Sequence, residues 1–404
     1  MSEAQRIPPS DKKIEHRALP PFSGWAGPRA PRMLIIGEAW GEHEAMTRQP
    51  FVGQSGMLLW QMLGEAMPQV EPELHAECLR IAYKRGNVWV RPRAEWLEAA
   101  GVAYTNVFNL RPMANKIESL CGLHKKELPA DYDYPAMGQF GYVQPQYLPE
   151  LDRLLTEIDV SRPNLIVAAG NSATWATLRS TSIGNIRGAV TYSVSEPPIK
   201  VLPIYHPAAI LRQWQWRPIT VADLIKAHRE SDFAELVRPE RHIIINPTLM
   251  DVLNWRDYML RGLPAYPRIV ACDVETQWGL VKCIGFSNVR NGAIVIPFFD
   301  PAKPLDAGLH YWSQQDDFVV RKAIRDVLQN DNIPKLFQNG MYDIQYILRM
   351  GIKPLNCLHD TMLLHHSLFP EMRKGLGFLG SIYTNEAAWK LMGRPKADTV
   401  KRDE

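Results

Sequence analysis

An apolar run that ends in two acidic residues constrains the fold of this chain more than any other feature. The run Ile269–Thr276 reads Ile-Val-Ala-Cys-Asp-Val-Glu-Thr, which is typical of a buried strand that emerges at its end. Residues i and i+2 of an extended strand project from one face, so Asp273 and Glu275 are predicted to point the same way. Taken alone, such a pair most often marks a solvated strand end.

A third carboxylate, in the segment Phe337–Asp343, changes that interpretation. If a helix begins at Asn339, this residue and Asp343 are i and i+4 and share a face. Three carboxylates that converge from a strand and a helix repel one another unless a cation neutralises them. Hard oxygen ligands favour Mg²⁺ or Mn²⁺ over zinc, and two such ions are typical of phosphodiester hydrolysis. The pattern therefore predicts a metal site made of Asp273, Glu275 and Asp343.

Length and composition narrow the class of protein. The 404 residues are too many for one ordinary core and favour two domains, and a net charge of +3 limits any nucleic-acid surface to a local patch. The five cysteines are scattered, without a Cys-x-x-Cys pair, which indicates reduced thiols in a cytoplasmic protein rather than a disulfide framework or a zinc finger. No apolar run approaches the roughly 20 residues of a membrane span, so we expect no membrane partner.

Strands alternate with helical stretches in the first half of the chain. Apolar strand patterns at Met33–Ile36, Asn164–Gly170 and Val201–Tyr205 predict an α/β sandwich with a mostly parallel sheet. The pattern breaks at Val237–Arg241, where we place a domain boundary. We expect an extended arm over residues 1–31, a first domain over 32–238 and a second domain over 241–404.

Four loops at the predicted strand ends carry polar and glycine residues. In open α/β sheets, ligands bind at the carboxyl ends of the strands, where such loops lie, and glycines let the backbone approach a ligand closely. Each loop alone is weak evidence, but four in this order form a specific pattern. The loops are Gly37–Glu42, Gln49–Gly56, Thr105–Pro112 and His206–Arg212.

These loops resemble the motifs of the uracil-DNA glycosylase superfamily, closest to the family 4 type, across roughly residues 32–230. Gly-Glu-Ala-x-Gly from Gly37 and Pro-Phe-Val-Gly around Phe51 match the first motif. Asn106 and Arg-Pro-x-x-Asn ending at Asn115 match the middle motif, and His-Pro-Ala-Ala from His206 matches the last. The resemblance implies a three-layer α/β/α fold and action on a base flipped out of DNA.

The resemblance also implies a role for each matching residue. Phe51 would stack on uracil, and Asn106 would form hydrogen bonds with its polar edge. His206 would donate a hydrogen bond to the uracil oxygen that gains negative charge. Ile210 or Leu211 would insert into the space that the flipped base leaves in the stack, and Arg212 would contact a phosphate. Glu38 and Asn115 are the candidates for positioning water. The alternative, that Phe51, Ile210 and Leu211 are simply core residues, stays open.

Two departures from the family pattern affect what we expect of this domain. Most family 4 enzymes carry a four-cysteine iron–sulfur cluster, but Leu110 stands where one cluster cysteine is expected, and no cysteine lies between Cys121 and Cys272. The domain is therefore predicted to be free of a cluster. Trp40 replaces the usual proline beside the pocket, where a bulky indole could change base selection or close the pocket.

The segment from about residue 266 onward resembles the 3′–5′ exonuclease domain of family A DNA polymerases, in the DnaQ-like (DEDD) superfamily. Asp273-Val-Glu-Thr matches the first motif of that family, Asn339-x-x-x-Asp343 its second, and His359–Leu363 the stretch that follows. The resemblance implies an RNase H-like α/β fold. The third motif, Tyr-x-x-x-Asp, is missing, so the domain is expected to be incomplete at its C-terminus. The carboxylates left as alternative fourth ligands are Asp360, Asp398 and Asp403.

A glycosylase-like domain followed by such an exonuclease resembles the N-terminal portion of certain phage family A DNA polymerases. We therefore expect a protein of phage DNA replication or repair that is part of a family A DNA polymerase. It would combine a base-recognition domain for uracil-containing DNA with a metal-dependent 3′–5′ exonuclease for single-stranded ends, and a polymerase subunit is the expected partner. The alternative is a non-catalytic replisome subunit that binds DNA, with an exonuclease completed only by the polymerase chain.

Overall fold

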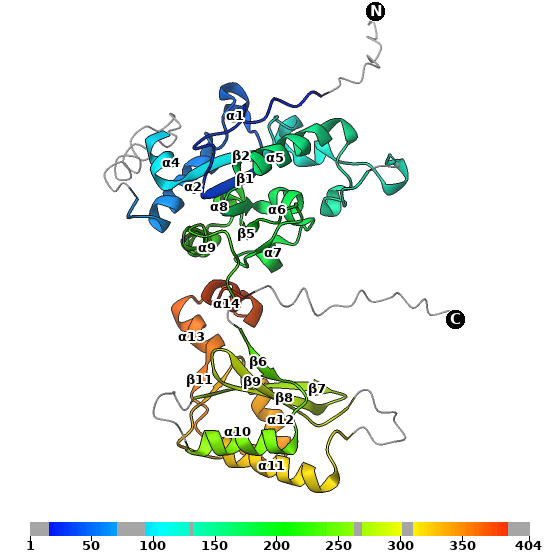
Figure 1. Cartoon of the computed structure of the whole chain (residues 1–404), viewed down its shortest axis with the longest axis vertical. Helices are drawn as coiled ribbons and strands as arrows, with labels where there is room; N and C mark the ends of the chain where they lie inside the picture. Colours follow the sequence, from blue (N-terminus) through cyan, green and yellow to red (C-terminus); the bar gives the residue numbers. More distant parts are fainter. Residues whose placement is uncertain are drawn as a thin grey trace, which may run out of the picture. The chain divides into compact units, whose positions relative to one another are not determined.

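The computed structural model describes residues 16–70, 94–129, 132–238, 240–261, 269–300 and 310–386. By its internal contacts the chain divides into two compact units, one of Met1–Leu236 with Gly380–Glu404 and one of Val237–Leu379 (Figure 1). Residues 1–15 of the predicted arm lie outside the described part. Within that part, no helix has both the length and the apolar character that a membrane crossing needs.

The first unit is built on a five-stranded sheet in the order β2-β1-β3-β5-β4. The first four strands of this order run parallel, and β4 pairs antiparallel with β5 at the edge. The strands are β1 (Met33–Ala39), β2 (Val102–Phe108), β3 (Leu165–Ala169), β4 (Thr191–Tyr192) and β5 (Lys200–Ile204).

Helices cover both faces of this sheet, because its central strands are apolar on both sides. Met33 and Ile35 of β1 belong to one core cluster and Leu34 and Ile36 to the other, as the alternation of a strand requires. The first cluster holds side chains of α2, α4, α8 and α9, and the second those of α5 and α6. The helices are α1 (Glu42–Thr47), α2 (Gln54–Ala66), α4 (Ala94–Ala100), α5 (Leu148–Ser161), α6 (Gly170–Leu178), α7 (Ile183–Ile186), α8 (Pro207–Arg212) and α9 (Arg217–Glu230).

The second unit contains a mixed six-stranded sheet in the order β11-β10-β7-β8-β9-β6. Strands β7, β8 and β9 form an antiparallel meander, while β10 and β11 continue parallel to β7 and β6 runs parallel to β9. The strands are β6 (His242–Ile244), β7 (Val270–Gln277), β8 (Leu280–Val289), β9 (Gly292–Pro297), β10 (Lys335–Phe337) and β11 (His359–Asp360).

The core of the second unit lies between this sheet and its helices, with α10 and α11 packed together (Figure 1). The last helix, α14, runs across the division between the two units. Both units are α/β, which confirms the predicted fold class. The helices are α10 (Leu249–Arg261), α11 (Gln314–Leu328), α12 (Met341–Arg349), α13 (Thr361–Leu368) and α14 (Leu376–Tyr383).

Candidate functional site

The base-binding candidates meet where β1 and β2 run side by side. The parallel register pairs Gly37 with Asn106, so the two residues are direct neighbours across the sheet. A Cβ atom on Gly37 would lie 2.2 Å from Asn106 Oδ1 and 2.7 Å from Phe51 Cζ. Only glycine leaves room for a carboxamide and an aromatic ring at this point. The structure thus brings Asn106 and Phe51 together, as the motifs predict.

Phe51 is a core residue that also lies beside Asn106 and His206. Its side chain is buried within the first core cluster, and its ring also stacks on the His206 ring, with centroids 6.5 Å apart and planes 27° apart. The Phe51 backbone has φ +54°, a left-handed conformation that is rare for a bulky residue and costs free energy. The surrounding loop holds Phe51 in this conformation, which is a feature more common at binding sites than elsewhere.

His206 lies just after β5 and begins α8. Its Nδ1 atom accepts a hydrogen bond of 3.2 Å from the backbone N–H of Ala208, so a neutral ring carries its proton on Nε2. Burial lowers the pKa of His206; Arg212 lowers it as well, and Glu38 opposes the shift. Gly170, with φ +86°, passes so close that a Cβ there would lie 2.9 Å from the His206 Cβ. His206 is therefore held as a neutral N–H donor.

Glu38, at the end of β1, is half-buried and held by a hydroxyl group. Ser172 Oγ donates a hydrogen bond of 2.5 Å to Glu38 Oε2. Ser172 lies in the first turn of α6, directly after β3, and sequence reasoning did not single it out. Its position at the start of a helix that follows a strand was the available signal, because all loops of this type converge at one edge of the sheet.

A second acidic residue, Glu44, ties two of the loops together. The buried Glu44 carboxylate accepts a hydrogen bond from the Gly53 N–H at 2.8 Å and another from the Gly41 N–H at 3.1 Å. These two glycines belong to the two halves of the first motif. Glu44 therefore fixes the position of the Phe51 loop against the loop that follows β1.

A buried ion network fixes the backbone next to the Asn106 side chain. Arg153 of α5 donates to the carbonyl oxygens of Asn106 and Val107 at 2.7 and 3.0 Å. The same guanidinium pairs with Glu150 at 2.9 Å and with Glu157 at 2.7 Å, and all three charged side chains are buried. A buried charged side chain is stable only when its polar atoms are paired. Because these three side chains pair with one another and with the backbone, they hold the end of β2 rigidly.

The two candidate wedge residues are adjacent on α8 but differ in their exposure to solvent. Ile210 is fully buried in the first core cluster, which favours the alternative that it is a core residue, and its role as a wedge stays a prediction. Leu211 is 45% exposed and Arg212 is exposed, which leaves both available to DNA. Beyond them Trp214 is 59% exposed in a short 3₁₀ turn, with the Arg217 guanidinium 5.4 Å from the Trp214 ring. Sequence reasoning did not single out Trp214.

Asn115 and Trp40 lie at the margin of this group. Asn115 is exposed, with φ +57°, and its Oδ1 atom accepts a hydrogen bond of 2.8 Å from Arg111 Nε. The structure does not bring it to the other pocket residues, and its water-positioning role stays a prediction. Trp40 is buried, and its indole N–H has no hydrogen-bond partner among the described residues. Such a donor is available to a ligand oxygen.

In the second unit, the carboxylates predicted to bind metal lie on β7 and α12. Asp273 and Glu275 are exposed, while Cys272 and Val274 between and beside them are buried, so the two acids share one face as predicted. Asp343, in the first turn of α12, is buried. Its Oδ1 atom accepts a hydrogen bond of 2.7 Å from the Val274 N–H, which holds α12 against β7.

The charges of these carboxylates interact unfavourably. Burial raises the pKa of Asp343 to about 6, and the negative charges of Asp273 and Asp360 add to the rise against the opposing hydrogen bond from Val274. Partial loss of water around the otherwise exposed Asp273 side chain also raises the pKa of Asp273. An unpaired group of this kind is destabilised as an anion, which is the condition that a bound cation relieves.

The turn before α12 differs from the helix predicted to begin at Asn339. Helix α12 begins at Met341, and Asn339 has φ +62°, so Asn339 and Asp343 are not on one helical face. Asp360 causes this geometry, because its carboxylate accepts hydrogen bonds from the Asn339 and Gly340 N–H groups at 3.1 and 2.8 Å.

Asp360 is therefore a poor candidate for a fourth metal ligand. Besides holding the turn before α12, its Oδ1 atom caps α13 by accepting from the Met362 N–H at 2.8 Å. Its oxygens are occupied by backbone donors. The other two candidates, Asp398 and Asp403, lie outside the described residues.

Comparison with known proteins identifies the first unit. The geometry above defines an α/β domain with its ligand loops at the carboxyl edge of a parallel sheet. The model of the Uracil DNA glycosylase superfamily matches residues 25–230, about half of the 404 residues, and the chain belongs to this superfamily.

Two relatives carry the name type-4 uracil-DNA glycosylase. The protein from Archaeoglobus fulgidus is 25% identical over 228 residues, which cover 55% of this chain and 83% of the relative. The protein from Thermotoga maritima is 26% identical over 200 residues, which cover 48% of this chain and 76% of the relative.

Solved structures also match this chain, at low sequence identity and low TM-score. The catalytic core of RRP6 from Trypanosoma brucei matches with 16% identity and a TM-score of 0.27, over 38% of this chain and 39% of that chain. The Nibbler EXO domain from Aedes aegypti matches with 14% identity and a TM-score of 0.28, over 38% of this chain and 74% of that chain.

The residues around Leu110 do not fit an iron–sulfur cluster. Leu110 packs against an apolar cluster that includes Val143 and, at its edge, Trp25. Cys121 belongs to the same cluster, and burial raises its pKa to about 11, which keeps it a thiol rather than the thiolate that iron requires. Leu110 and Cys121 thus lie in apolar packing that offers no thiolate among the described residues, and a cluster-free domain stays a prediction.

The carboxylates of the second unit fit a divalent cation by their chemistry. They are hard oxygen donors, and the Asp273–Asp343 pair carries the unfavourable charge that Mg²⁺ or Mn²⁺ would offset. Within the described residues, however, no group of three or more histidine, cysteine or acidic side chains is already gathered to hold a metal. Glu275 would have to complete the site from the neighbouring position on β7.

Proposed function

We propose that the first unit removes uracil from DNA by hydrolysis of its glycosidic bond. The observation that carries this proposal is the arrangement of His206, Phe51 and Asn106 around one point at the carboxyl edge of the sheet. Phe51 offers a ring face to a flipped base, and the Asn106 amide can both donate and accept at the polar edge of uracil. The type-4 names of the relatives support uracil as the base.

The chemistry follows from where charge develops. As the bond from the sugar to the base breaks, its electron pair moves onto the base, and negative charge collects on a uracil oxygen. The neutral His206 donates its Nε2 proton in a hydrogen bond to that oxygen, and this bond strengthens in the transition state. Water then adds to the sugar carbon, oriented by Glu38, which Ser172 holds in place. The proton that this water loses goes to the uracil anion, which is released as neutral uracil.

Replacement of His206 tests this proposal directly. His206→Ala should slow uracil release by on the order of 10²–10³, because one donor to the developing charge is lost, while DNA binding changes far less. The matched control is His124→Ala, at an exposed histidine that the pocket does not contain. If the wild-type chain binds uracil-containing strands but never releases uracil, the first unit is a binding module instead, and Trp40 is the residue to examine first.

We also propose that the second unit trims single-stranded 3′ ends with Mg²⁺ or Mn²⁺ held by Asp273, Asp343 and Glu275. The hydrogen bond from the Val274 N–H to Asp343 carries this proposal, because it sets the Asp343 carboxylate against the part of β7 that bears Asp273 and Glu275. When bound, the metal would supply charge neutralisation at the scissile phosphate. Asp273→Ala should abolish trimming and leave uracil release unchanged, whereas Asp326→Ala, in an exposed ion pair on α11, should change neither activity. Undiminished trimming by Asp273→Ala contradicts the assignment.

We further propose that trimming by this chain is weak alone and is completed by a polymerase chain that carries Tyr-x-x-x-Asp. Asp360 is occupied by backbone donors, so three carboxylates remain among the described residues to hold metal and water. Titration of a family A polymerase of phage type into the nuclease assay should raise the trimming rate. Full-strength trimming without any partner argues against this part of the proposal, and no activity in either unit favours the non-catalytic replisome subunit.

A further inference from the structure

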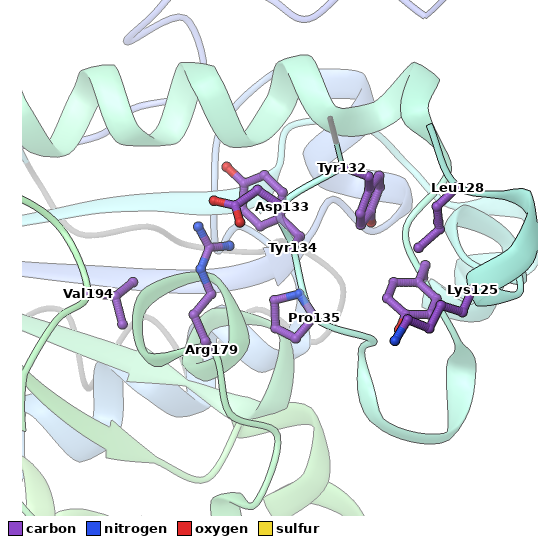
Figure 2. A pocket seen from close by; sticks show the side chains of 9 residues that line it. Lys125, Leu128, Tyr132, Asp133, Tyr134, Pro135, Arg179 and Val194 are labelled. Carbon is purple, nitrogen blue, oxygen red and sulfur yellow. The ribbon is translucent and has the colours of Figure 1, made fainter. Parts of the chain in front are cut away.

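A second pocket lies in the first unit, separate from the residues around His206. Its volume is about 630 Å³, within the range of small-molecule and nucleotide sites. Figure 2 shows Arg179 on one side of it, Lys125 on the other, and Tyr132 and Tyr134 between them. No role predicted from the sequence falls on these residues. The polar and aromatic side chains that line it are Lys125, Tyr132, Asp133, Tyr134, Tyr142 and Arg179.

The tyrosines form a connected aromatic wall. The Tyr132 ring lies 5.7 Å from the Tyr142 ring and 6.3 Å from the Tyr134 ring, edge to face in both pairs. The Tyr132 hydroxyl donates to the Val143 carbonyl at 3.0 Å, which fixes the orientation of its ring. An aromatic wall held in this way needs little ordering before a planar ligand packs against it.

Arg179 adds a cation with spare hydrogen-bonding capacity. Its guanidinium carbon lies 3.8 Å from the centroid of the Tyr134 ring, so the two groups are stacked. Its Nη1 atom is buried and has no hydrogen-bond partner among the described residues. A guanidinium stacked on a ring with a free N–H edge is suited to a phosphate or to a base. Lys125, exposed on the opposite side, adds a second positive charge.

We propose that this pocket binds one nucleotide of a DNA strand whose target base occupies the first pocket. Aromatic faces combined with cations are the usual elements of a single-strand binding site, because every base has a π face and every nucleotide carries a phosphate. Within a strand, a nucleotide has a phosphate on each side, which matches cations on two sides of the aromatic wall. Asp133 supplies an acceptor for an N–H group of the base. This inference rests on the proposed action of the first unit on DNA.

Helix α6 connects the two pockets. Ser172, near its start, holds Glu38 of the first pocket, and Arg179 follows its last residue. At 1.5 Å per residue, the two positions are about 10 Å apart along the helix. A stacked strand advances roughly 3.4 Å per nucleotide, so a few nucleotides span the part of α6 between these two residues. Trp175, between them, donates from its indole to the Pro135 carbonyl at 2.9 Å and anchors the pocket wall to α6.

The test compares binding of two single strands to the full chain by fluorescence anisotropy. One strand reaches only the first pocket, and the other extends about five nucleotides beyond it on either side. Arg179→Gln should weaken binding of the longer strand by on the order of tenfold and leave the shorter strand unchanged. The matched control is Arg162→Gln, because Arg162 also ends a helix in a left-handed conformation but lies at the exposed end of α5.

A second pair of variants guards against a folding defect in Arg179→Gln. Lys125→Ala should also weaken binding of the longer strand. Lys126→Ala removes the same charge from the neighbouring exposed residue, which does not line the pocket, and should leave that binding unchanged. A scan with abasic sites along a strand that carries a cleavage-resistant 2′-fluoro-deoxyuridine should find a sensitive position separate from the uracil, and Arg179→Gln should remove that sensitivity.

The outcomes separate the possible ligands and the two proposals. If deoxyadenosine monophosphate binds saturably and Arg179→Gln removes this binding, the pocket also takes a free nucleotide. If the free nucleotide does not bind but Arg179→Gln weakens binding of the longer strand, the pocket is specific for a nucleotide within a strand. If Arg179→Gln and Lys125→Ala behave like their controls with both ligands, the inference is overturned. Uracil release is measured on the same variants. If the strand-length effect is seen but uracil is not released, the proposed excision fails; if uracil is released but the strand-length effect is missing, the second pocket fails.

Discussion

Gly37 and Asn106 are direct neighbours on parallel strands. Because Gly37 has no side chain, the Asn106 carboxamide can lie directly over the Gly37 backbone. A Cβ atom on Gly37 would stand 2.2 Å from Asn106 Oδ1, well inside contact distance. The Phe51 ring closes on the same point. The two residues proposed to bind the base therefore depend on a residue that has no functional group.

Gly37→Ala should impair base excision while the domain stays folded. The added methyl group must displace Asn106 or Phe51, and a misplacement of about 1 Å in a catalytic site can cost on the order of 10²-fold in rate. The matched control is Gly184→Ala, because a Cβ on Gly184 of α7 would meet no atom within 4 Å. Uracil release and thermal unfolding are measured on both variants. Equal release by both would show that the Gly37–Asn106 contact does not matter to the reaction.

Much of this arrangement could be predicted from the sequence, because strand periodicity and loop position are local properties. The alternation of Asp273 and Glu275 with buried neighbours and the placement of His206 at a strand end both follow from short patterns. Ile210 could not be separated from Leu211 in this way. Whether a residue of a short helix faces the core depends on how that helix packs, and adjacent residues of one helix differ in this respect.

Long-range contacts account for what sequence reasoning missed or predicted wrongly. Ser172, Glu44 and Arg153 act on the pocket from helices that are distant in sequence from the groups they hold. Asn339 does not begin a helix because Asp360, from a later strand, accepts hydrogen bonds from the turn. Such partners are set by the tertiary structure, and no local pattern announces them.

Arg153→Met should destabilise the first unit by about 3–5 kcal/mol, because it leaves the Glu150 and Glu157 carboxylates buried without their cation. Denaturant unfolding monitored by tryptophan fluorescence measures the change. The matched control is Arg162→Met at the end of the same helix, where the partner Asp159 is exposed and a change below about 1 kcal/mol is expected. Similar losses in both variants would show that the buried network contributes little.

Metal binding to the second unit should strengthen as pH rises through about 6. Asp343 has a pKa of about 6, raised above its usual value, so it is mostly protonated at about pH 5 and ionised at about pH 8. A metal ligand must be deprotonated, and at about pH 5 only about one carboxyl in ten is available. Titration calorimetry with Mn²⁺ should show affinity about tenfold weaker at the lower pH.

Asp343→Asn provides the counterpart to that measurement. The amide oxygen can still accept from the Val274 N–H, but the charge is gone, so metal affinity should fall and its dependence on pH through 6 should disappear. Without metal, the raised pKa means that ionisation of Asp343 opposes folding, and its unfavourable contribution is present above about pH 6 and absent below the unfolded value. Asp343→Asn should therefore be more stable than the wild type at about pH 8 without metal. A variant with unchanged metal affinity would remove Asp343 from the site.

Leu211→Ala should distinguish duplex from single-stranded substrates. In a duplex, a target base leaves the stack at a cost of a few kcal/mol, and a side chain that fills the gap recovers part of that cost. Leu211 is exposed on α8, five residues after His206, whereas the neighbouring Ile210 is buried and unavailable. We expect uracil release from duplex DNA to fall by on the order of tenfold and release from single strands to change by less than about twofold. The matched control is Leu155→Ala, at a partly exposed leucine of α5, for which neither substrate should respond. An equal loss on both substrates would mean that Leu211 supports the fold of α8 and does not enter the stack.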